Sequence, residues 1–242
     1  MNLGFNLSIA NKSIIDVKKE IAEYYKAGDT AIELSLTDLE GILEFPFNEI
    51  YDDLLKFRYI SIHLPVIYRD ASNNKIFLTY PSPIVEPHIK VIQKIADILK
   101  IKTYVLHPDQ VKDFNWSSNE FGKLLGFENM DNRKEFGKSI RDMKAVFDQC
   151  PEAKWIFDIN HLYTNDNTME SAKQMYEAFK TRLTHYHISA FGGFHSSFTK
   201  NPHELVILKG VLDNQHPLIH EGYKYSDLNI SEELNLIKAN LD

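Results

Sequence analysis

Residues 154–182, KWIFDINHLYTNDNTMESAKQMYEAFKTR, contain a complete strand–loop–helix unit, and this unit decides the fold. The run over 154–159 (KWIFDI) is almost continuously apolar, which is typical of a strand buried on both faces. The stretch over 168–182 has apolar residues at helical spacing, which predicts an amphipathic helix. Because parallel strands need a crossover connection, usually a helix, the unit indicates a parallel sheet.

The same unit recurs along the chain. Further buried strands are predicted at 3–9, 30–36, 59–64, 103–107, 123–128, 185–189 and 218–221. Further helices are predicted at 13–27, 47–57, 84–100, 132–149, 202–212 and 231–241. Eight strands in 242 residues suit a (β/α)8 barrel, whose usual length is ~200 to 400 residues. A doubly wound open sheet is the rival, but no Gly-x-Gly-x-x-Gly turn follows the first strand. We predict one α/β domain over 1–242, a (β/α)8 TIM barrel.

Composition excludes several other classes of protein. Hydrophobic residues make up 43% and charged residues 25% of the chain, which excludes disorder and collagen-like repeats. The apolar stretches are too short to span a membrane, and MNLGFNLSIANK lacks the features of a signal peptide. The single cysteine, Cys150, has no partner in the chain for a disulfide, so we expect a cytoplasmic protein. The net charge of −7 gives no overall attraction for nucleic acid, and a homo-oligomer is compatible with the sequence.

Polar side chains stand at or just beyond the C-terminal end of every predicted strand. They are Asn6, Glu33, His63, His107, Glu128, Asp158 with His161 just beyond it, His187 and Glu221. In a TIM barrel these strand ends converge on one mouth, where the active sites of this fold lie. Seven of the eight strands therefore direct an ionisable side chain at the same small volume.

Three of these side chains, Glu128, Asp158 and Glu221, are carboxylates that need a compensating charge. At ~5 Å and an effective dielectric constant of ~20, each pair repels by about 3 kcal/mol. Lysine and arginine are absent from the strand ends, so a divalent cation is the expected compensation. Mixed oxygen and nitrogen ligation favours zinc, manganese or iron over magnesium or calcium.

The number of ions stays open at this point. One ion would be held by Glu128, Asp158, His187 and Glu221, which leaves a net charge of −1. His63 and His107 would then be available to bind substrate. Two ions that share Glu128, together with one hydroxide, balance the charge and add His63 and His107 as ligands of the second metal.

Six short strings carry a family resemblance. They are SIHLP (61–65), VLHPD (105–109), GFENMD (126–131), FDINH (157–161), HYHIS (185–189) and IHEGY (219–223). In this order they resemble the xylose-isomerase-like TIM barrels, which include sugar and sugar-phosphate isomerases and epimerases and also endonuclease IV. The Asp-x-x-His element from Asp158 to His161 is the most specific of them.

The resemblance implies roles for individual residues. In the isomerase and epimerase branch, the residues that match Glu128, Asp158, His187 and Glu221 bind one divalent metal. There Glu128 and Glu221 also act as acid and base, and His161 contacts substrate. In the endonuclease IV branch, His63 and His107 join Glu128 to bind a second zinc, and His161 belongs to a third zinc site.

The sequence departs from both branches of this family. Gly193 stands where the third zinc site of the endonuclease has an aspartate, so only His195 of that pair is present, and some epimerases have an arginine at the same position. Ala190 breaks the His-x-x-Asp that usually follows the seventh strand. The missing aspartate weighs against a trinuclear phosphodiesterase site, and the sequence favours a metal-dependent isomerase or epimerase that acts on a small carbohydrate or hydroxy-carbonyl compound. The alternatives are an endonuclease IV-like zinc phosphodiesterase acting on nucleic acid and a barrel that binds a ligand without turnover.

Three further expectations concern the surroundings of the mouth. The irregular insert over 66–83 is either a lid that excludes water or holds a substrate phosphate through Arg69, or a disordered surface loop. Glu33 is a candidate substrate-binding residue or a backbone cap. His185 is expected to face outward, toward the helices.

Overall fold

The computed structural model describes residues 2–192, 195–222 and 229–241. Within these residues, eight parallel strands close into a barrel in the order β1-β10-β9-β8-β7-β6-β3-β2. The strands are β1 (Leu3–Ser8), β2 (Ala31–Ser35), β3 (Tyr59–His63), β6 (Thr103–Leu106), β7 (Leu125–Glu128), β8 (Lys154–Asp158), β9 (Leu183–Ile188) and β10 (Leu218–His220). The predicted TIM barrel is therefore confirmed.

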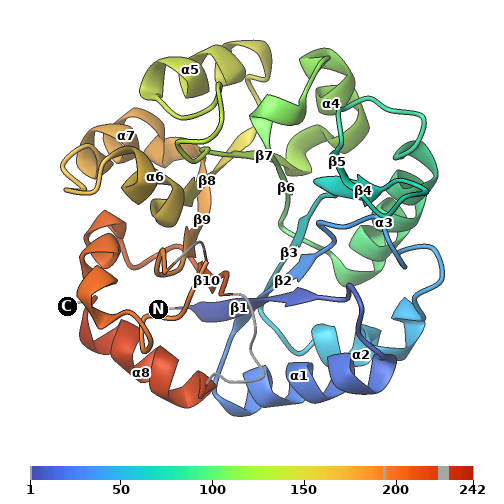
Figure 1. The fold of residues 1–242 in the computed structure, drawn as a ribbon, viewed down its shortest axis with the longest axis horizontal. Coiled ribbons are helices and arrows are strands. Elements are labelled where there is room, and N and C mark those ends of the chain that lie inside the picture. The colour runs from blue at the N-terminus through green and yellow to red at the C-terminus, as the bar shows by residue number, and fades with distance from the viewer. Residues whose placement is uncertain (1, 193–194, 223–228, 242) are drawn as a thin grey trace.

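Helices surround the barrel on its outside (Figure 1). They are α1 (Ile14–Lys26), α2 (Tyr51–Leu54), α3 (Glu86–Leu99), α4 (Phe114–Phe121), α5 (Ile140–Gln149), α6 (Ile159–Asn165), α7 (Ala172–Phe179) and α8 (Ile230–Ala239). No helix in the described part of the chain is both long enough and apolar enough to cross a membrane.

Several helix predictions need correction. The helix predicted at 132–149 begins only at Ile140, because Gly137 has a φ of 88° and Ser139 forms a capping box with Asp142. The segment predicted at 202–212 consists of 3-10 turns (Pro202–Gly210), and 47–57 is a 3-10 turn followed by the short α2. Helices α4 and α6 were not predicted, since both are short and carry mixed polar and apolar residues.

The insert over 66–83 is also more regular than predicted. Strands β4 (Ile67–Arg69) and β5 (Lys75–Phe77) pair as an antiparallel hairpin, and the carboxylate of Asp70 accepts the backbone N–H of Asn74 in its turn. The side chain of Gln110 donates to the carbonyls of Val66 and Leu78, which fixes the base of the hairpin to the loop after β6. The insert is thus a folded element attached to the barrel.

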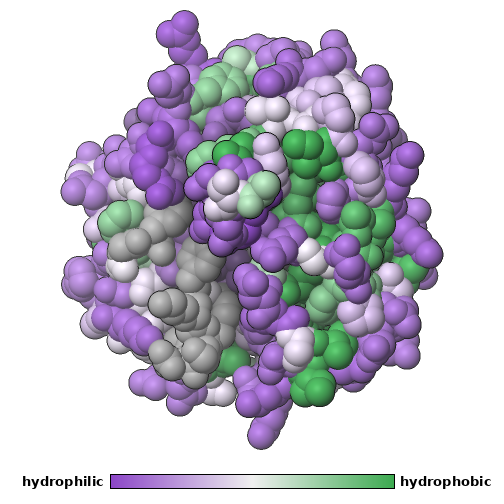
Figure 2. Space-filling view, turned by 45° about the vertical axis from the view of Figure 1, so that its right-hand side comes forward, coloured by the Kyte–Doolittle hydropathy of each residue, from purple (hydrophilic) through white to green (hydrophobic). Residues whose placement is uncertain are grey.

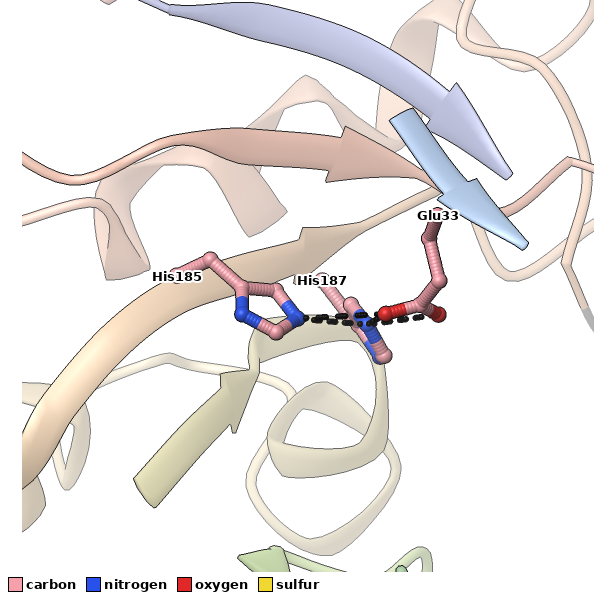
Figure 3. Close-up of side chains that lie close together, drawn as sticks. All are labelled: Glu33, His185 and His187. Carbon is pink, nitrogen blue, oxygen red and sulfur yellow. Dashed lines mark hydrogen bonds and ion pairs between the residues drawn. The ribbon is translucent and has the colours of Figure 1, made fainter. Parts of the chain in front are cut away.

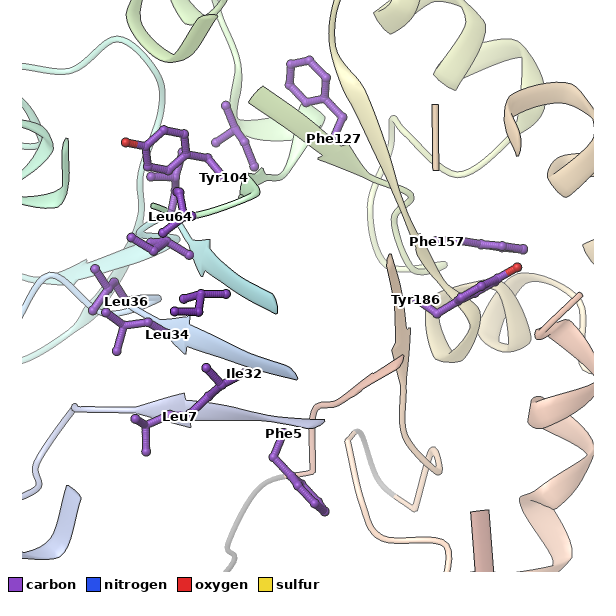
Figure 4. Close-up of a cluster of buried hydrophobic side chains, with 14 of the residues drawn as sticks. Phe5, Leu7, Ile32, Leu34, Leu36, Leu64, Tyr104, Phe127, Phe157 and Tyr186 are labelled. Atoms are coloured by element: carbon purple, nitrogen blue, oxygen red, sulfur yellow. The ribbon is translucent and has the colours of Figure 1, made fainter. Parts of the chain in front are cut away.

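Alternation along β2 separates an apolar outer face from a polar residue in the barrel interior. Ile32 and Leu34 of β2 belong to the buried hydrophobic cluster (Figure 4), whereas Glu33 between them points the opposite way, toward Ser61 of β3. Trp155 and Phe157 of β8 stack with ring centroids 4.4 Å apart. Outward apolar residues of the strands therefore pack against the helices, and the barrel interior holds polar residues such as Glu33 together with Ile156 and Ile219, which pair with Glu128 and His187.

Asp29, which follows α1, provides a test of burial outside the barrel mouth. Neither carboxylate oxygen has a hydrogen-bond partner among the described residues, and burial raises the pKa of Asp29 from 3.8 to about 8, with Lys238 opposing the shift. Above pH 4 the carboxyl group of Asp29 ionises in the unfolded chain but stays protonated in the folded protein. The loss of folding free energy therefore grows with pH between these two pKa values and is complete above pH 8. We expect Asp29→Asn to raise the free energy of unfolding by about 1–3 kcal/mol at pH 8 and by ~0 near pH 4. Urea denaturation at both pH values measures the difference, and a pH-independent effect would contradict it.

Candidate metal centre

The polar residues at the strand ends meet inside the barrel mouth and form two groups that share Glu128. One ligand atom from each of Glu128, Asp158, His187 and Glu221 lies within 4.8 Å of the others. His63, His107 and Glu128 form a second group within the same limit. The structure therefore brings together all six residues that the sequence proposed as metal ligands.

Strand register explains why these side chains converge. Asp158, at the end of β8, pairs directly with His187 of β9, and Glu128 ends the neighbouring β7. His107 follows β6 and precedes the 3-10 turn Pro108–Gln110, one residue beyond the strand itself. Glu221 follows β10, and its backbone N–H donates to the carbonyl of Ile188.

Glu128 has one oxygen on each side of the centre. Its Oε1 lies 3.0 Å from His187 Nδ1, while its Oε2 lies 3.1 Å from His107 Nε2 and 3.5 Å from His63 Nε2. On the first side, His187 Nδ1 is also 3.4 Å from Glu221 Oε2. Glu128 is thus placed to bridge the two groups.

The donor set fits divalent cations. Glu128 Oε2 and Asp158 Oδ2 are buried and accept no well-formed hydrogen bond from the described residues, although the other oxygen of Asp158 accepts the backbone N–H of His161. Ligand atoms around a tetrahedral cation lie about 3.3 Å apart when each bond is ~2.0–2.1 Å, as for zinc. The distances of 3.0–3.5 Å between Glu128, His187, His107 and His63 match that spacing.

The electrostatics of the cluster also favour a divalent cation at this site. Among the described residues, the ion pairs of Glu128, Asp158 and Glu221 are all with histidines, and none is with lysine or arginine. Burial and the charges of Glu128 and Glu221 raise the pKa of Asp158 well above its ordinary value. Burial also raises the pKa of Glu221 to about 7, although His187 opposes it.

Protons compensate the remaining charge in the absence of a cation. Burial opposes protonation of His187, but the carboxylates of Glu221, Glu33 and Glu128 raise its pKa well above the ordinary value. Burial likewise opposes protonation of His63, yet contacts with the same carboxylates raise its pKa to about 8. A bound cation would replace these protons, so metal binding is expected to release them.

Two more histidines lie beside this centre. His161 Nδ1 donates to the carbonyl of Asn129 at 2.9 Å and is 3.3 Å from Asp158 Oδ2. His195 Nδ1 is 3.2 Å from Ser189 Oγ and 3.8 Å from Glu221 Oε2. Gly193, where the resemblance of the sequence to endonuclease IV implied an aspartate, lies outside the described residues.

The centre opens into a cavity of about 910 Å³. His63, His107, Glu128, His161, His195 and Glu221 line its floor. At the rim, Phe77 of the β4–β5 hairpin contacts the ammonium group of Lys134, which also pairs with Asp109 at 2.7 Å. Lys75 and Arg133 line the same cavity, and Arg133 is paired with Asp131. The hairpin therefore forms part of the wall of the cavity.

The surface near the hairpin is less polar than the rest of this side of the molecule. Figure 2 shows a largely hydrophilic face with apolar side chains gathered on one half of it. Ile76, Phe77 and Ile84 are among the large apolar residues that are exposed. Of these three, Phe77 lines the cavity.

Arg69 does not line the cavity. Its guanidinium lies 3.3 Å from Asp38 and 3.4 Å from Glu40, so it stabilises the hairpin against the loop after β2. Lys75 of the same hairpin takes the place in the cavity that the sequence suggested for Arg69.

Glu33 and His185 lie in the barrel interior, below the cavity (Figure 3). The expectation that His185 faces outward is wrong, because residues two apart on a strand share a face and His185 therefore points inward with His187. The alternation along β9 is the sequence signal that could have identified His185. Asn129 was also missed: its amide bonds both the N–H and the carbonyl of Asp158.

Comparisons with known proteins identify the fold. No protein-family model matches the chain, and no curated protein matches it in sequence. Endonuclease IV from Thermus thermophilus is similar in structure, with a TM-score of 0.68 at 15% identity, over 100% of this chain and 99% of that one. A 3-keto-D-glucoside 4-epimerase from E. coli gives 0.60 at 12% identity, over 99% of both chains. A xylose isomerase domain protein from Alicyclobacillus acidocaldarius gives 0.59 at 13% identity, over 99% of both.

Fold and site together define a TIM barrel with a buried cluster of carboxylates and histidines at its mouth. More particularly, the chain has the fold of the xylose-isomerase-like barrels, as the resemblance of its six strings implied.

Proposed function

We propose that this protein is a divalent-metal-dependent enzyme that hydrolyses a phosphate ester of a sugar-containing substrate, with two cations sharing Glu128. The observation that carries the proposal is the position of Glu128, whose two oxygens face different ligand groups. A carboxylate that bridges two cations is not available to carry a proton, as the epimerase chemistry of the related barrels would require. Paired cations are typical of enzymes that hydrolyse phosphate esters.

Charge balance supports two cations. Glu128, Asp158 and Glu221 are all buried, so three carboxylates meet at the centre. Two divalent cations together with one hydroxide would balance their charge, whereas one cation alone leaves a net charge of −1.

The chain's own residues have separate tasks in this reaction. His63 and His107 would hold one cation with Glu128, and Asp158, His187 and Glu221 would hold the other. When bound, the cations supply an activated water and neutralise the charge that develops on the phosphoryl oxygens. Lys75 and Arg133, which line the cavity, would bind the remaining phosphate oxygens, and the hairpin would limit access of solvent.

The second candidate is the isomerase or epimerase that the sequence favours. The observation in its favour is Glu221, a carboxyl group that lines the cavity and whose pKa is raised by burial to about 7, which suits a general acid or base. In that reaction one cation would suffice, and His63 and His107 would contact the sugar.

Replacement of His107 by glutamine distinguishes phosphate-ester hydrolysis from isomerisation or epimerisation. Under the proposed function, His107→Gln should lose one of two equivalents of tightly bound Zn²⁺ and lower phosphodiester hydrolysis ~10²-fold or more, because one cation supplies several kcal/mol. Metal analysis measures the Zn²⁺ content. Cleavage of bis(p-nitrophenyl) phosphate and of an abasic-site duplex measures the rate of phosphodiester hydrolysis. His216→Gln, which alters a histidine paired with Asp213 outside the centre, is the matched control.

The opposite result would favour the second candidate. A wild-type protein that binds one equivalent of metal, cleaves neither phosphodiester and exchanges solvent deuterium into ketohexoses would refute the proposed hydrolysis.

A further inference from the structure

A second polar cluster lies below the proposed metal centre, inside the barrel. Glu33 of β2, Ser61 of β3 and His185 of β9 are all fully buried and do not line the cavity. Figure 3 shows His185 and His187, both on β9, meeting Glu33 from β2. The metal centre uses only His187 of these residues, so the other three need a separate explanation.

His187 is held between this cluster and the metal centre. Its Nδ1 lies 3.0 Å from Glu128 Oε1 and 3.4 Å from Glu221 Oε2. Its Nε2, on the other side of the ring, lies 3.2 Å from Glu33 Oε1 and 3.3 Å from Glu33 Oε2. One nitrogen therefore faces the ligands and the other faces a buried carboxylate.

The available donors determine where the protons lie. Ser61 Oγ donates to Glu33 Oε2 at 2.7 Å, and Tyr59 Oη lies 2.8 Å from His185 Nδ1. His185 Nε2 lies 3.0 Å from His187 Nε2, so these two nitrogens cannot both carry a proton. When His187 is protonated on Nε2, His185 carries its proton on Nδ1 and donates it to the Tyr59 hydroxyl, and its bare Nε2 faces the N–H of His187. Glu33 Oε1 accepts no well-formed hydrogen bond from the rest of the described chain, so the Nε2 proton of His187 is the group that can satisfy it.

We propose that Glu33 is a positioning residue: it accepts the Nε2 proton of His187 and so presents the Nδ1 lone pair to the metal. Ser61 donates to the carboxylate of Glu33, and His185, which is hydrogen-bonded to Tyr59, lies against Nε2 of His187. This role rests on the proposed metal centre, and it assigns Glu33 to the support of a ligand and not to substrate. Carboxylates that accept the distal proton of a metal-bound histidine fix its tautomer and increase its basicity.

The test measures metal binding and the tautomer of His187 separately from activity. In Glu33→Gln, the affinity for the first equivalent of Zn²⁺, titrated against a chromophoric chelator, should fall 10–100-fold. Long-range ¹H–¹⁵N spectra of the Zn²⁺-loaded protein, labelled at histidine, should show His187 protonated on Nε2 in wild type and a changed pattern in Glu33→Gln. Tyr59→Phe should give a smaller loss of affinity, because it removes a hydroxyl that acts on His187 only through His185.

Asp213→Asn is the matched control for strand β9. Asp213 accepts the hydroxyl of Tyr186, the residue between His185 and His187, on the outer face of β9. The substitution perturbs this strand without touching the interior cluster, so Zn²⁺ affinity and the His187 spectrum should stay as in wild type.

Three results would overturn the inference. Unchanged affinity and spectrum in Glu33→Gln would mean that Glu33 does not position His187. Loss of a separate equivalent of Zn²⁺, with the remaining affinity unchanged, would mean that Glu33, His185 and His187 bind a metal themselves. Wild-type protein that binds no Zn²⁺ would refute the proposed function together with this inference, and that failure is recognisable because it occurs without any substitution.

Discussion

Replacement of Glu128 by glutamine should abolish hydrolysis, with a loss of about 10³-fold or more, and remove at least one equivalent of bound metal. The reason is that Glu128 is the shared ligand: one oxygen faces His187 and the other faces His63 and His107. An amide offers one neutral oxygen in place of two charged ones, so it cannot hold both cations. Several kcal/mol of transition-state stabilisation depend on them. Metal analysis after gel filtration and a phosphodiesterase assay measure the two effects.

Glu233→Gln is the matched control for this prediction. Glu233 is also a fully buried glutamate that pairs with a histidine, His220 at 2.9 Å, and it accepts the backbone N–H groups of Phe198 and Thr199. It belongs to neither of the two ligand groups, so its variant should lose stability but retain metal. Equal metal content in Glu128→Gln and wild type would refute the bridging role.

Replacement of Glu221 by glutamine should abolish turnover and leave the fold intact. Burial raises the pKa of Glu221 to about 7, so in the metal-free protein its ionisation opposes folding between its ordinary pKa of 4.5 and pH 7 and above. The metal-free variant should therefore be at least as stable as wild type at pH 8, while activity falls about 10²-fold or more. A thermal melt of metal-free protein and the activity assay of the reloaded protein check both parts.

The combination of these two readouts separates loss of function from loss of fold. A variant that melts well below wild type would attribute the missing activity to unfolding, and unchanged activity would remove Glu221 from the site. Either candidate reaction requires Glu221, so this prediction tests the site independently of the choice between them.

The barrel was predictable because its strands are buried on both faces. Each strand therefore forms a short apolar run that local sequence identifies, as in 154–159 and 30–36. Helix starts were less predictable, since the start of α5 depends on the turn at Gly137 and the cap at Ser139, within a segment that has helical spacing throughout.

The ligand cluster was predictable for a related reason. Parallel strands in a closed barrel end at the same mouth, so residues such as Glu128 and Asp158 are brought together by topology alone. What escaped prediction depends on depth and side-chain direction. Glu33 lies one layer below the cavity, and Arg69 pairs with Asp38 and Glu40 on the hairpin side.

The sequence by itself determined the eight strands, their closure into a barrel and the identity of the polar residues at its mouth, because these follow from local burial and chain order. Only the tertiary structure decided that Glu128 faces both ligand groups and that Glu33 lies against His187 from below. Those relations depend on the register between strands far apart in the sequence and on distances of a few ångströms, for which no pattern in the sequence is specific.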